Sequence, residues 1–280
     1  MKSGPDPKEF FSNLKSFPNK NLGQNFIKDL RVIDRIIEMS GLSPEDEVVE
    51  IGPGLGALTF ALSENVGRVV AIEKDKKLAD YLRELFHNNS AVNIVNEDAL
   101  KTNYSKFYSG KKIKVIANLP YSVSTPLLFK LLEERQYIDS MVLMLQLEVG
   151  QRITANPGGK TYGSISVLQQ TYMDIISLFR VSPESFWPKP KVDSVVLKFT
   201  PLKEPRIAVS DEKLYEKVIR AAFSSRRKMI GNSLQSILPK KRVEEVLELA
   251  NIDRKRRAET LTIEEFGTLV EKVSLIEKRK

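Results

Sequence analysis

The sequence predicts an α/β protein, in which a mostly parallel sheet with helices on both faces is followed by a small all-helical domain. Between residues 29 and 145, short apolar runs typical of buried strands alternate with segments whose apolar residues recur at helical spacing. After Pro201 and Pro205 only the helical spacing continues. Alternation of this kind is typical of βαβ units that build a parallel sheet.

Each element of the sheet is expected from its own pattern. A helix is expected from Asp29, because apolar residues recur at helical spacing until Gly41 ends the segment. Another is expected at Thr125, which suits an N-cap, with Pro126 in the first turn. Two more helices are expected around residues 58–62 and 78–85. Strands are expected at residues 48–51, 69–72, 92–95, 113–117 and 141–145, and a hairpin-like sheet edge at residues 175–181 and 195–199.

The chain is expected to divide between residues 203 and 204. Residues 1–203 then form the sheet domain, with residues 1–19 as a flexible N-terminal arm among prolines and polar residues. Residues 204–280 form the helical domain, whose last helix starts at Thr262, where Glu265 completes a capping box. Its earlier helices are expected around residues 214–222 and 243–249.

The amino-acid composition excludes several classes of functional site. The 280 residues include no cysteine and one histidine, His87, which removes disulfides, Cys-based metal sites and thiolate nucleophiles. The formal charge is +8, and residues 205–280 hold 18 Lys and Arg against 12 Asp and Glu. Clustered basicity indicates a nucleic-acid partner, although solubility alone is the other interpretation. No apolar run approaches the ~20 residues that cross a bilayer, and no secretory signal is expected.

A glycine-rich stretch, EIGPGLG at residues 50–56, follows the first expected strand and opens a helix. Glycines such as Gly52 and Gly54 let the chain turn tightly and let a ligand approach the backbone. The spacing differs from the dinucleotide pattern G-x-G-x-x-G, and Pro53 lacks the N–H that a phosphate cradle uses. The loop therefore suits a ligand without a pyrophosphate.

Two acidic residues follow the next two strands. Glu73 is placed to accept hydrogen bonds from both hydroxyls of a ribose, and Asp98 from an adenine amino group. Either alone is also explained as a solvated loop acid, but together they indicate a nucleoside site. A nucleoside without phosphates in a Rossmann-like fold indicates S-adenosyl-L-methionine, and hence a class I methyltransferase without a metal. The missing cysteines exclude radical enzymes and the methylation of pyrimidine carbons through a cysteine adduct.

The stretch NLPY, residues 118–121, ends the fourth expected strand at the same edge. The side-chain oxygen of Asn118 and the carbonyl of Leu119 are suited to accept hydrogen bonds from an exocyclic amine, and Pro120 fixes the backbone. Two acceptors localise the amine lone pair, so that positioning replaces a strong base. Tyr121 is suited to stack on the purine ring.

A second aromatic lies in the loop FWPKPKVDS, residues 186–194. Phe186 is expected to cover the other face of an extruded base, and Lys189 and Lys191 to hold neighbouring phosphates. The alternative is that Phe186 packs beneath the loop, which is the role we expect for Trp187.

With these motifs the sequence resembles the rRNA adenine N6,N6-dimethyltransferases, in particular the KsgA (RsmA) branch that acts on 16S rRNA. The resemblance runs from about Lys20 to Phe266. It includes NLGQNF at residues 21–26, the glycine loop, NLPY followed by STP, and the loop at residues 186–194. It also includes FSSRRK at residues 223–228 and RAETL at residues 257–261, which resemble this branch more than the antibiotic-resistance methyltransferases of 23S rRNA.

The resemblance implies functional residues and a substrate. It adds Asn25 and Ile27 to the donor contacts, with leucine in many relatives at the position of Ile27. It implies dimethylation of two adjacent adenines in a 3′-terminal hairpin of 16S rRNA, within the immature 30S subunit, by a cytoplasmic monomer. The alternatives are 23S rRNA methylation and a mainly non-catalytic assembly factor. Arg226, Arg227 and Lys228 are then phosphate contacts or a solvated helix face, and residues 254–257 allow the same two interpretations.

Overall fold

The computed structural model describes residues 4–13, 15, 17–19 and 22–278, and it divides into two compact units. The sheet unit comprises Met1–Gly150 and Ile175–Pro201, and the helical unit comprises Gln151–Asp174 and Leu202–Lys280. The predicted division at residue 203 lies two residues from the second junction. Residues 151–174, which the sequence analysis assigned to the sheet domain, pack instead with the C-terminal helices.

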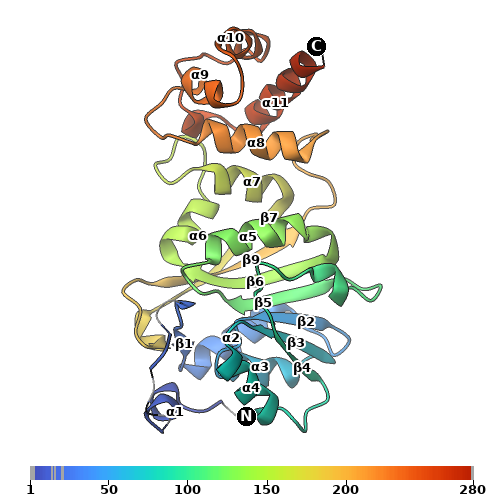
Figure 1. The fold of residues 1–280 in the computed structure, drawn as a ribbon, viewed down its shortest axis with the longest axis vertical. Helices are drawn as coiled ribbons and strands as arrows, with labels where there is room; N and C mark the ends of the chain where they lie inside the picture. Colours follow the sequence, from blue (N-terminus) through green and yellow to red (C-terminus); the bar gives the residue numbers. More distant parts are fainter. Residues whose placement is uncertain (1–3, 14, 16, 20–21, 279–280) are drawn as a thin grey trace. The chain divides into compact units, whose positions relative to one another are not determined.

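The sheet unit is built on a seven-stranded sheet in the order β4-β3-β2-β5-β6-β9-β7 (Figure 1). The first five of these strands pair in parallel, and β9 pairs antiparallel with β6. The strands are β2 (Glu47–Ile51), β3 (Arg68–Glu73), β4 (Val92–Asn96), β5 (Ile113–Asn118), β6 (Ile138–Gln146), β7 (Met173–Val181) and β9 (Ser194–Pro201). All five predicted strands and the predicted sheet edge are thus confirmed.

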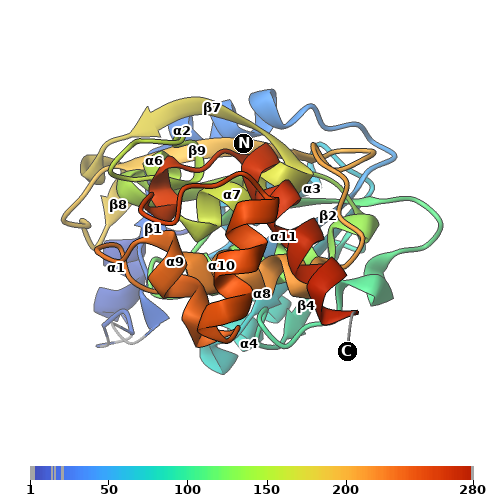
Figure 2. The ribbon, with the colours of Figure 1, turned by 90° about the horizontal axis from the view of Figure 1, so that it is seen from above.

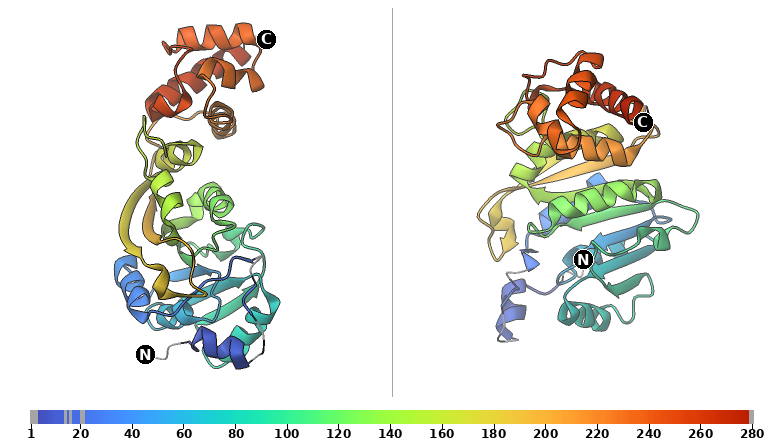
Figure 3. Two further views of the ribbon diagram at one scale, coloured as in Figure 1. Left: turned by 90° about the vertical axis from the view of Figure 1, so that its left-hand side faces the viewer. Right: turned by 45° about the horizontal axis from the view of Figure 1, so that its top comes forward.

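Four helices of the sheet unit follow the predicted pattern: α2 (Leu30–Ser40), α3 (Ala57–Ser63), α4 (Lys76–Leu85) and α5 (Ser124–Glu133). Asp29 caps α2 by accepting a hydrogen bond from the backbone of Arg31, and Gly41 ends it in the left-handed conformation. The predicted N-cap Thr125 is wrong, because α5 already begins at Ser124. Figure 3 shows α2 and α5 on opposite sides of the sheet.

Apolar side chains of the helices and strands form the core of the sheet unit. Ile36 of α2 and Leu62 of α3 are buried against Val69 and Val196 of the sheet. Burial of such side chains is the main stabilising contribution to a fold of this size.

The N-terminal region differs from the expectation of a flexible arm. It contains helix α1 (Pro7–Asn13), whose Phe11 is buried in an apolar cluster. Strand β1 (Phe26–Ile27) pairs antiparallel with β8 (Phe186–Trp187). Lys20 and Asn21, at the start of the family resemblance, lie outside the described residues.

The helical unit gathers the C-terminal helices (Figure 2). They are α8 (Glu212–Ala222), α9 (Ile230–Ser233), α10 (Lys240–Leu249) and α11 (Ile263–Glu277). The capping box of α11 is confirmed, since the backbone N–H of Glu265 donates to Thr262 Oγ1 at 3.2 Å and that of Thr262 to Glu265 Oε2 at 2.8 Å. Helix α7 (Ser164–Tyr172) was not predicted, nor was α6 (Leu147–Ile153), which begins in the sheet unit.

Short 3-10 helices complete the described secondary structure: η2 (Tyr104–Phe107), η3 (Arg135–Tyr137), η4 (Pro183–Ser185), η5 (Leu234–Ser236) and η6 (Ala258–Thr260). Among the described residues, every helix is too short or too polar to cross a bilayer.

Candidate functional site

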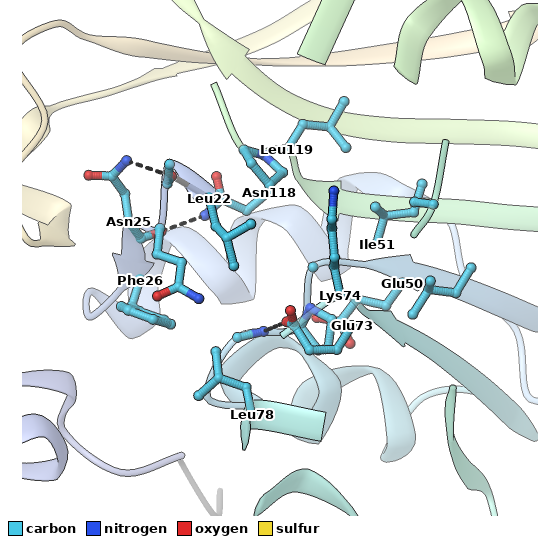
Figure 4. A pocket seen from close by; sticks show the side chains of 18 of the residues that line it. Leu22, Asn25, Phe26, Glu50, Ile51, Glu73, Lys74, Leu78, Asn118 and Leu119 are labelled. Carbon is cyan, nitrogen blue, oxygen red and sulfur yellow. Dashed lines mark hydrogen bonds between the residues drawn. The ribbon is translucent and has the colours of Figure 1, made fainter. Parts of the chain in front are cut away.

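A pocket opens at the carboxyl ends of the parallel strands, where the strand order reverses. Strand β2 lies between β3 and β5, so that the chain crosses the sheet in both directions from this point. Open α/β sheets bind ligands at such switch points. The pocket is lined by most of the predicted site residues: Asn25, Ile27, Gly52, Gly54, Glu73, Asp98, Asn118, Leu119, Pro120 and Tyr121. Figure 4 shows part of this lining.

Gly54 holds the glycine loop against two neighbours. Its φ of +60° is a left-handed conformation that side chains rarely adopt, and a Cβ atom would lie 2.9 Å from the ring of Phe26. Its N–H donates a hydrogen bond of 3.2 Å to Glu73 Oε2. The loop is therefore fixed to the next strand end, as one wall of the pocket.

Glu73 is a buried carboxyl group, 6% exposed, at the end of β3. Its Oε1 accepts a hydrogen bond of 2.8 Å from the backbone of Asp75. Burial raises the pKa of Glu73 to about 7, although the N–H groups of Asp75 and Gly54 oppose the shift. A carboxyl group held by two backbone donors keeps further lone pairs for ligand hydroxyls.

Glu50 is a second buried carboxyl group that lines the pocket, and the sequence analysis gave it no role. It is 1% exposed, and Thr59 Oγ1 of α3 donates to its Oε2 at 2.6 Å. Burial raises the pKa of Glu50 to about 8. A buried acid in the first half of a glycine motif is visible in the sequence, but its burial is not.

Asp98 is partnered by a residue that the sequence analysis missed. Lys74 Nζ lies 2.8 Å from Asp98 Oδ2, and the backbone of Leu100 donates to Oδ1 at 3.1 Å. The hydrogen bond from Lys74 lowers the pKa of Asp98. Asp98 is therefore ionised and oriented at the pocket rim, as an acceptor for an amino group requires.

Asn118 is oriented by the N-terminal segment. Its Nδ2 donates a hydrogen bond of 2.9 Å to the backbone carbonyl of Asn25 (Figure 4). This bond commits the nitrogen end of the amide, so that Oδ1 is the end left to accept a hydrogen bond from a ligand. The side chain of Asn25 turns back to donate to Gly23 O at 3.1 Å.

The side chain of Tyr121 is held by the loop of residues 186–194. Its hydroxyl lies 2.6 Å from Ser194 Oγ, which joins residues 118–121 to the loop of residues 186–194. Because Ser194 is fully buried, this contact holds the phenol end and leaves a face of the ring beside the pocket.

Phe186 does not lie on the pocket. Its ring is 1% exposed and packs in the core beside Ile27 and Val181. In this conformation the ring packs beneath its loop, which was the alternative interpretation, and it reaches a base only if the loop moves. Trp187 packs on Phe11, with ring centroids 5.5 Å apart, as expected for a structural residue.

The predicted phosphate contacts differ in their surroundings. Lys189 and Lys191 are both exposed, and Lys189 forms an ion pair with Glu184. Arg226, Arg227 and Lys228 are exposed in the turn after α8 and form no ion pair with another described residue. By contrast, three arginines of the 254–257 run are paired, Arg254 with Glu244, Arg256 with Glu265 and Arg257 with Glu259.

The pocket fits an adenosyl ligand. Ionised Asp98 suits an amino group, and Glu73 suits two hydroxyls. Within the described part of the chain, no cluster of acidic and histidine side chains could hold a metal ion.

Comparison with known proteins identifies the family. A family model described as ribosomal RNA adenine dimethylase matches residues 16–274. The chain belongs to the ribosomal RNA adenine dimethylase family. It is 46% identical over 264 residues to a protein of Clostridium botulinum named ribosomal RNA small subunit methyltransferase A, covering 94% of this chain and 96% of that protein.

Two solved structures of rRNA-modifying enzymes share the fold. The dimethyladenosine transferase of Plasmodium falciparum aligns with a TM-score of 0.76 at 26% identity, over 91% of this chain and 98% of that one. The 23S rRNA methyltransferase ErmE aligns with a TM-score of 0.66, also at 26% identity, over 89% of this chain and 99% of that one. The predicted Rossmann-like class I methyltransferase fold is thus confirmed for this member of the family.

Proposed function

We propose that this chain dimethylates N6 of two adjacent adenines in a 3′-terminal hairpin of 16S rRNA, with S-adenosyl-L-methionine as the donor. The observation that carries the proposal is Asn118, whose amide oxygen is oriented by Asn25 in the same pocket as the nucleoside acceptors Glu73 and Asp98. We propose further that the protein acts as a cytoplasmic monomer on the immature small subunit, late in its assembly.

The methyl donor is bound by residues at the carboxyl ends of strands β2, β3 and β4. Glu73 accepts hydrogen bonds from the ribose hydroxyls, and Asp98 accepts one from the adenine amino group. Gly52 lets the ligand lie against the backbone. When bound, S-adenosyl-L-methionine supplies a methyl group on a positively charged sulfur, which is an electrophile for an amine.

The acceptor residues act by position. Asn118 Oδ1 and the carbonyl oxygen of Leu119 accept hydrogen bonds from the two N–H groups of the unmethylated amine, and from the one that remains before the second transfer, and so hold its lone pair toward the methyl group. Tyr121 stacks on the base, at an angle set by Ser194. Holding reactants in line is worth several orders of magnitude in rate, and the amine proton can pass to water once the nitrogen is methylated.

The test is a labelled-methyl assay on small ribosomal subunits that lack the modification. Asn118→Ala is expected to reduce the turnover number by about 10²–10³-fold, the usual effect of losing an oriented hydrogen-bonding group at a reacting centre. Gln235→Ala, in the helical unit, is the control and should retain full activity. An Asn118→Ala enzyme with normal turnover would remove Asn118 from the mechanism.

The second candidate is methylation of 23S rRNA, which the similarity to ErmE supports. Large and small subunits without methylation distinguish the two in the same assay. Label in the large subunit alone would replace the 16S assignment.

A further inference from the structure

The segment of residues 4–13 packs against the donor pocket, although neither the family match nor the resemblance includes it. Pro5 and Pro7 line the pocket, and Pro7 is buried. A Cβ atom on Gly4 would lie 3.1 Å from Leu55 O and 3.2 Å from Ala57 N. The backbone at residue 4 thus lies directly on the glycine loop and on the first residue of α3.

Aromatic rings attach this segment to the sheet unit. The ring of Phe11 lies 5.3 Å from that of Phe26 and 5.5 Å from that of Trp187. The ring of Phe10 lies 4.7 Å from that of Tyr81 on α4, in an edge-to-face arrangement. Because Phe26 itself lies against Gly54, Phe11 is connected to the glycine loop through one intervening ring.

Helix α1 depends on these contacts for its position. A helix of seven residues is too short to be stable by itself in water, so its position depends on the packing of Phe10 and Phe11. Loss of that packing is therefore expected to free the segment from the pocket.

We propose that residues 4–13 form a clasp that closes the donor pocket, with Phe11 as the positioning residue that holds it shut. The inference rests on the proposed function, since it takes S-adenosyl-L-methionine to be the ligand. The closed clasp slows dissociation of donor and product. It must open between methyl transfers, because each transfer consumes one donor.

The first variant is Phe11→Ala. It is expected to raise the donor dissociation rate and the donor KM by about tenfold, which corresponds to about 1.4 kcal/mol. The turnover number at saturating donor and the KM for small subunits should change less than about twofold. A general folding defect lowers the turnover number and the melting temperature instead.

Trp187 gives a direct signal, since it is the only tryptophan in the chain. Donor binding to the wild type should change Trp187 fluorescence as the clasp closes, and Phe11→Ala should abolish this change. Phe17→Ala is the matched control, because Phe17 is 88% exposed and should leave both signal and rates unchanged.

A second variant keeps every aromatic ring. Gly4→Val places a side chain 3.1 Å from Leu55 O and 3.2 Å from Ala57 N, which is closer than ordinary van der Waals contact, and should also speed donor dissociation. If the wild type binds donor but both variants retain its dissociation rate, the clasp is refuted and the proposed function stands. If the wild type does not bind S-adenosyl-L-methionine at all, both proposals fail.

Discussion

At the scale of single residues, Glu50 makes the stability of the fold depend on pH. Its pKa is raised from an ordinary value of 4.5 to about 8 by burial. Between these values the unfolded chain has lost a proton that the folded chain keeps. The free energy of unfolding therefore falls as the pH rises through this window, by roughly 1.4 kcal/mol per pH unit. Glu73 adds to the same trend up to a pH of about 7.

We expect Glu50→Gln to remove the Glu50 part of this dependence. The amide keeps an oxygen that can accept from Thr59, and it does not ionise. Urea denaturation at about pH 5 and about pH 8 should show a smaller loss of stability in the variant than in the wild type.

The control is Asp46→Asn. Although burial raises the pKa of Asp46, hydrogen bonds from Lys114, Ser43 and Lys111 lower it to about 2, so this variant should keep the wild-type slope. Equal slopes for Glu50→Gln and the wild type would contradict the argument.

Some site residues could be predicted from the sequence, and others could not. Strand ends place Glu73, Asp98 and Asn118 at one edge, because parallel strands align their carboxyl ends, and these residues could be predicted. The burial of Phe186 and the pairing of Lys74 with Asp98 could not. Both depend on side-chain packing between segments far apart in the sequence, on which a local pattern carries no information.

At the scale of elements, periodicity predicted the structure wherever an element is regular and packs one face. Helix α2 is an example, whereas strand β6 is buried along most of its length and was predicted from a continuous apolar run. Helix α1 was not predicted, because its position depends on tertiary contacts of Phe11, which a local pattern does not show. Helices α6 and α7 were not predicted, because a turn with Pro157 and two glycines separates them.

The glycine loop is the element on which donor binding most depends. Gly54→Ala forces a side chain into a left-handed conformation, at a cost of about 1–2 kcal/mol, and also pushes against the ring of Phe26. We expect a lower stability together with a donor affinity at least about tenfold weaker, measured by calorimetry. Gly158→Ala is the matched control, since Gly158 has a φ of +86° but nothing within 4 Å of its Cβ position. It should lose stability and bind donor normally. A Gly54→Ala protein with wild-type affinity would show that the loop does not shape the donor site.

At the scale of the whole molecule, the positive charge has two different roles. Of the Lys and Arg residues in the last quarter of the chain, Arg254 and Arg256 are neutralised by glutamates. Arg256 in addition fixes the capping box of α11 through Glu265. The turn at residues 226–228 is exposed and has no such partner among the described residues. Charge that the protein does not neutralise itself is available to a polyanion.

We therefore expect the triple variant Arg226→Ala, Arg227→Ala, Lys228→Ala to weaken rRNA binding in a salt-dependent manner. Each lost phosphate contact reduces the slope of log affinity against log salt concentration by about 0.7–0.9, so three contacts reduce it by about 2–3. Filter binding of a 16S rRNA hairpin fragment over a range of salt concentrations measures this slope, and donor affinity should stay unchanged. Arg254→Ala is the control of like charge, because Glu244 already occupies its guanidinium at 2.9 Å. The contradicting result is an Arg254→Ala variant that lowers the salt-dependence slope by as much per removed charge as the triple variant does. That result would show that the net charge, and not the turn at residues 226–228, binds the RNA.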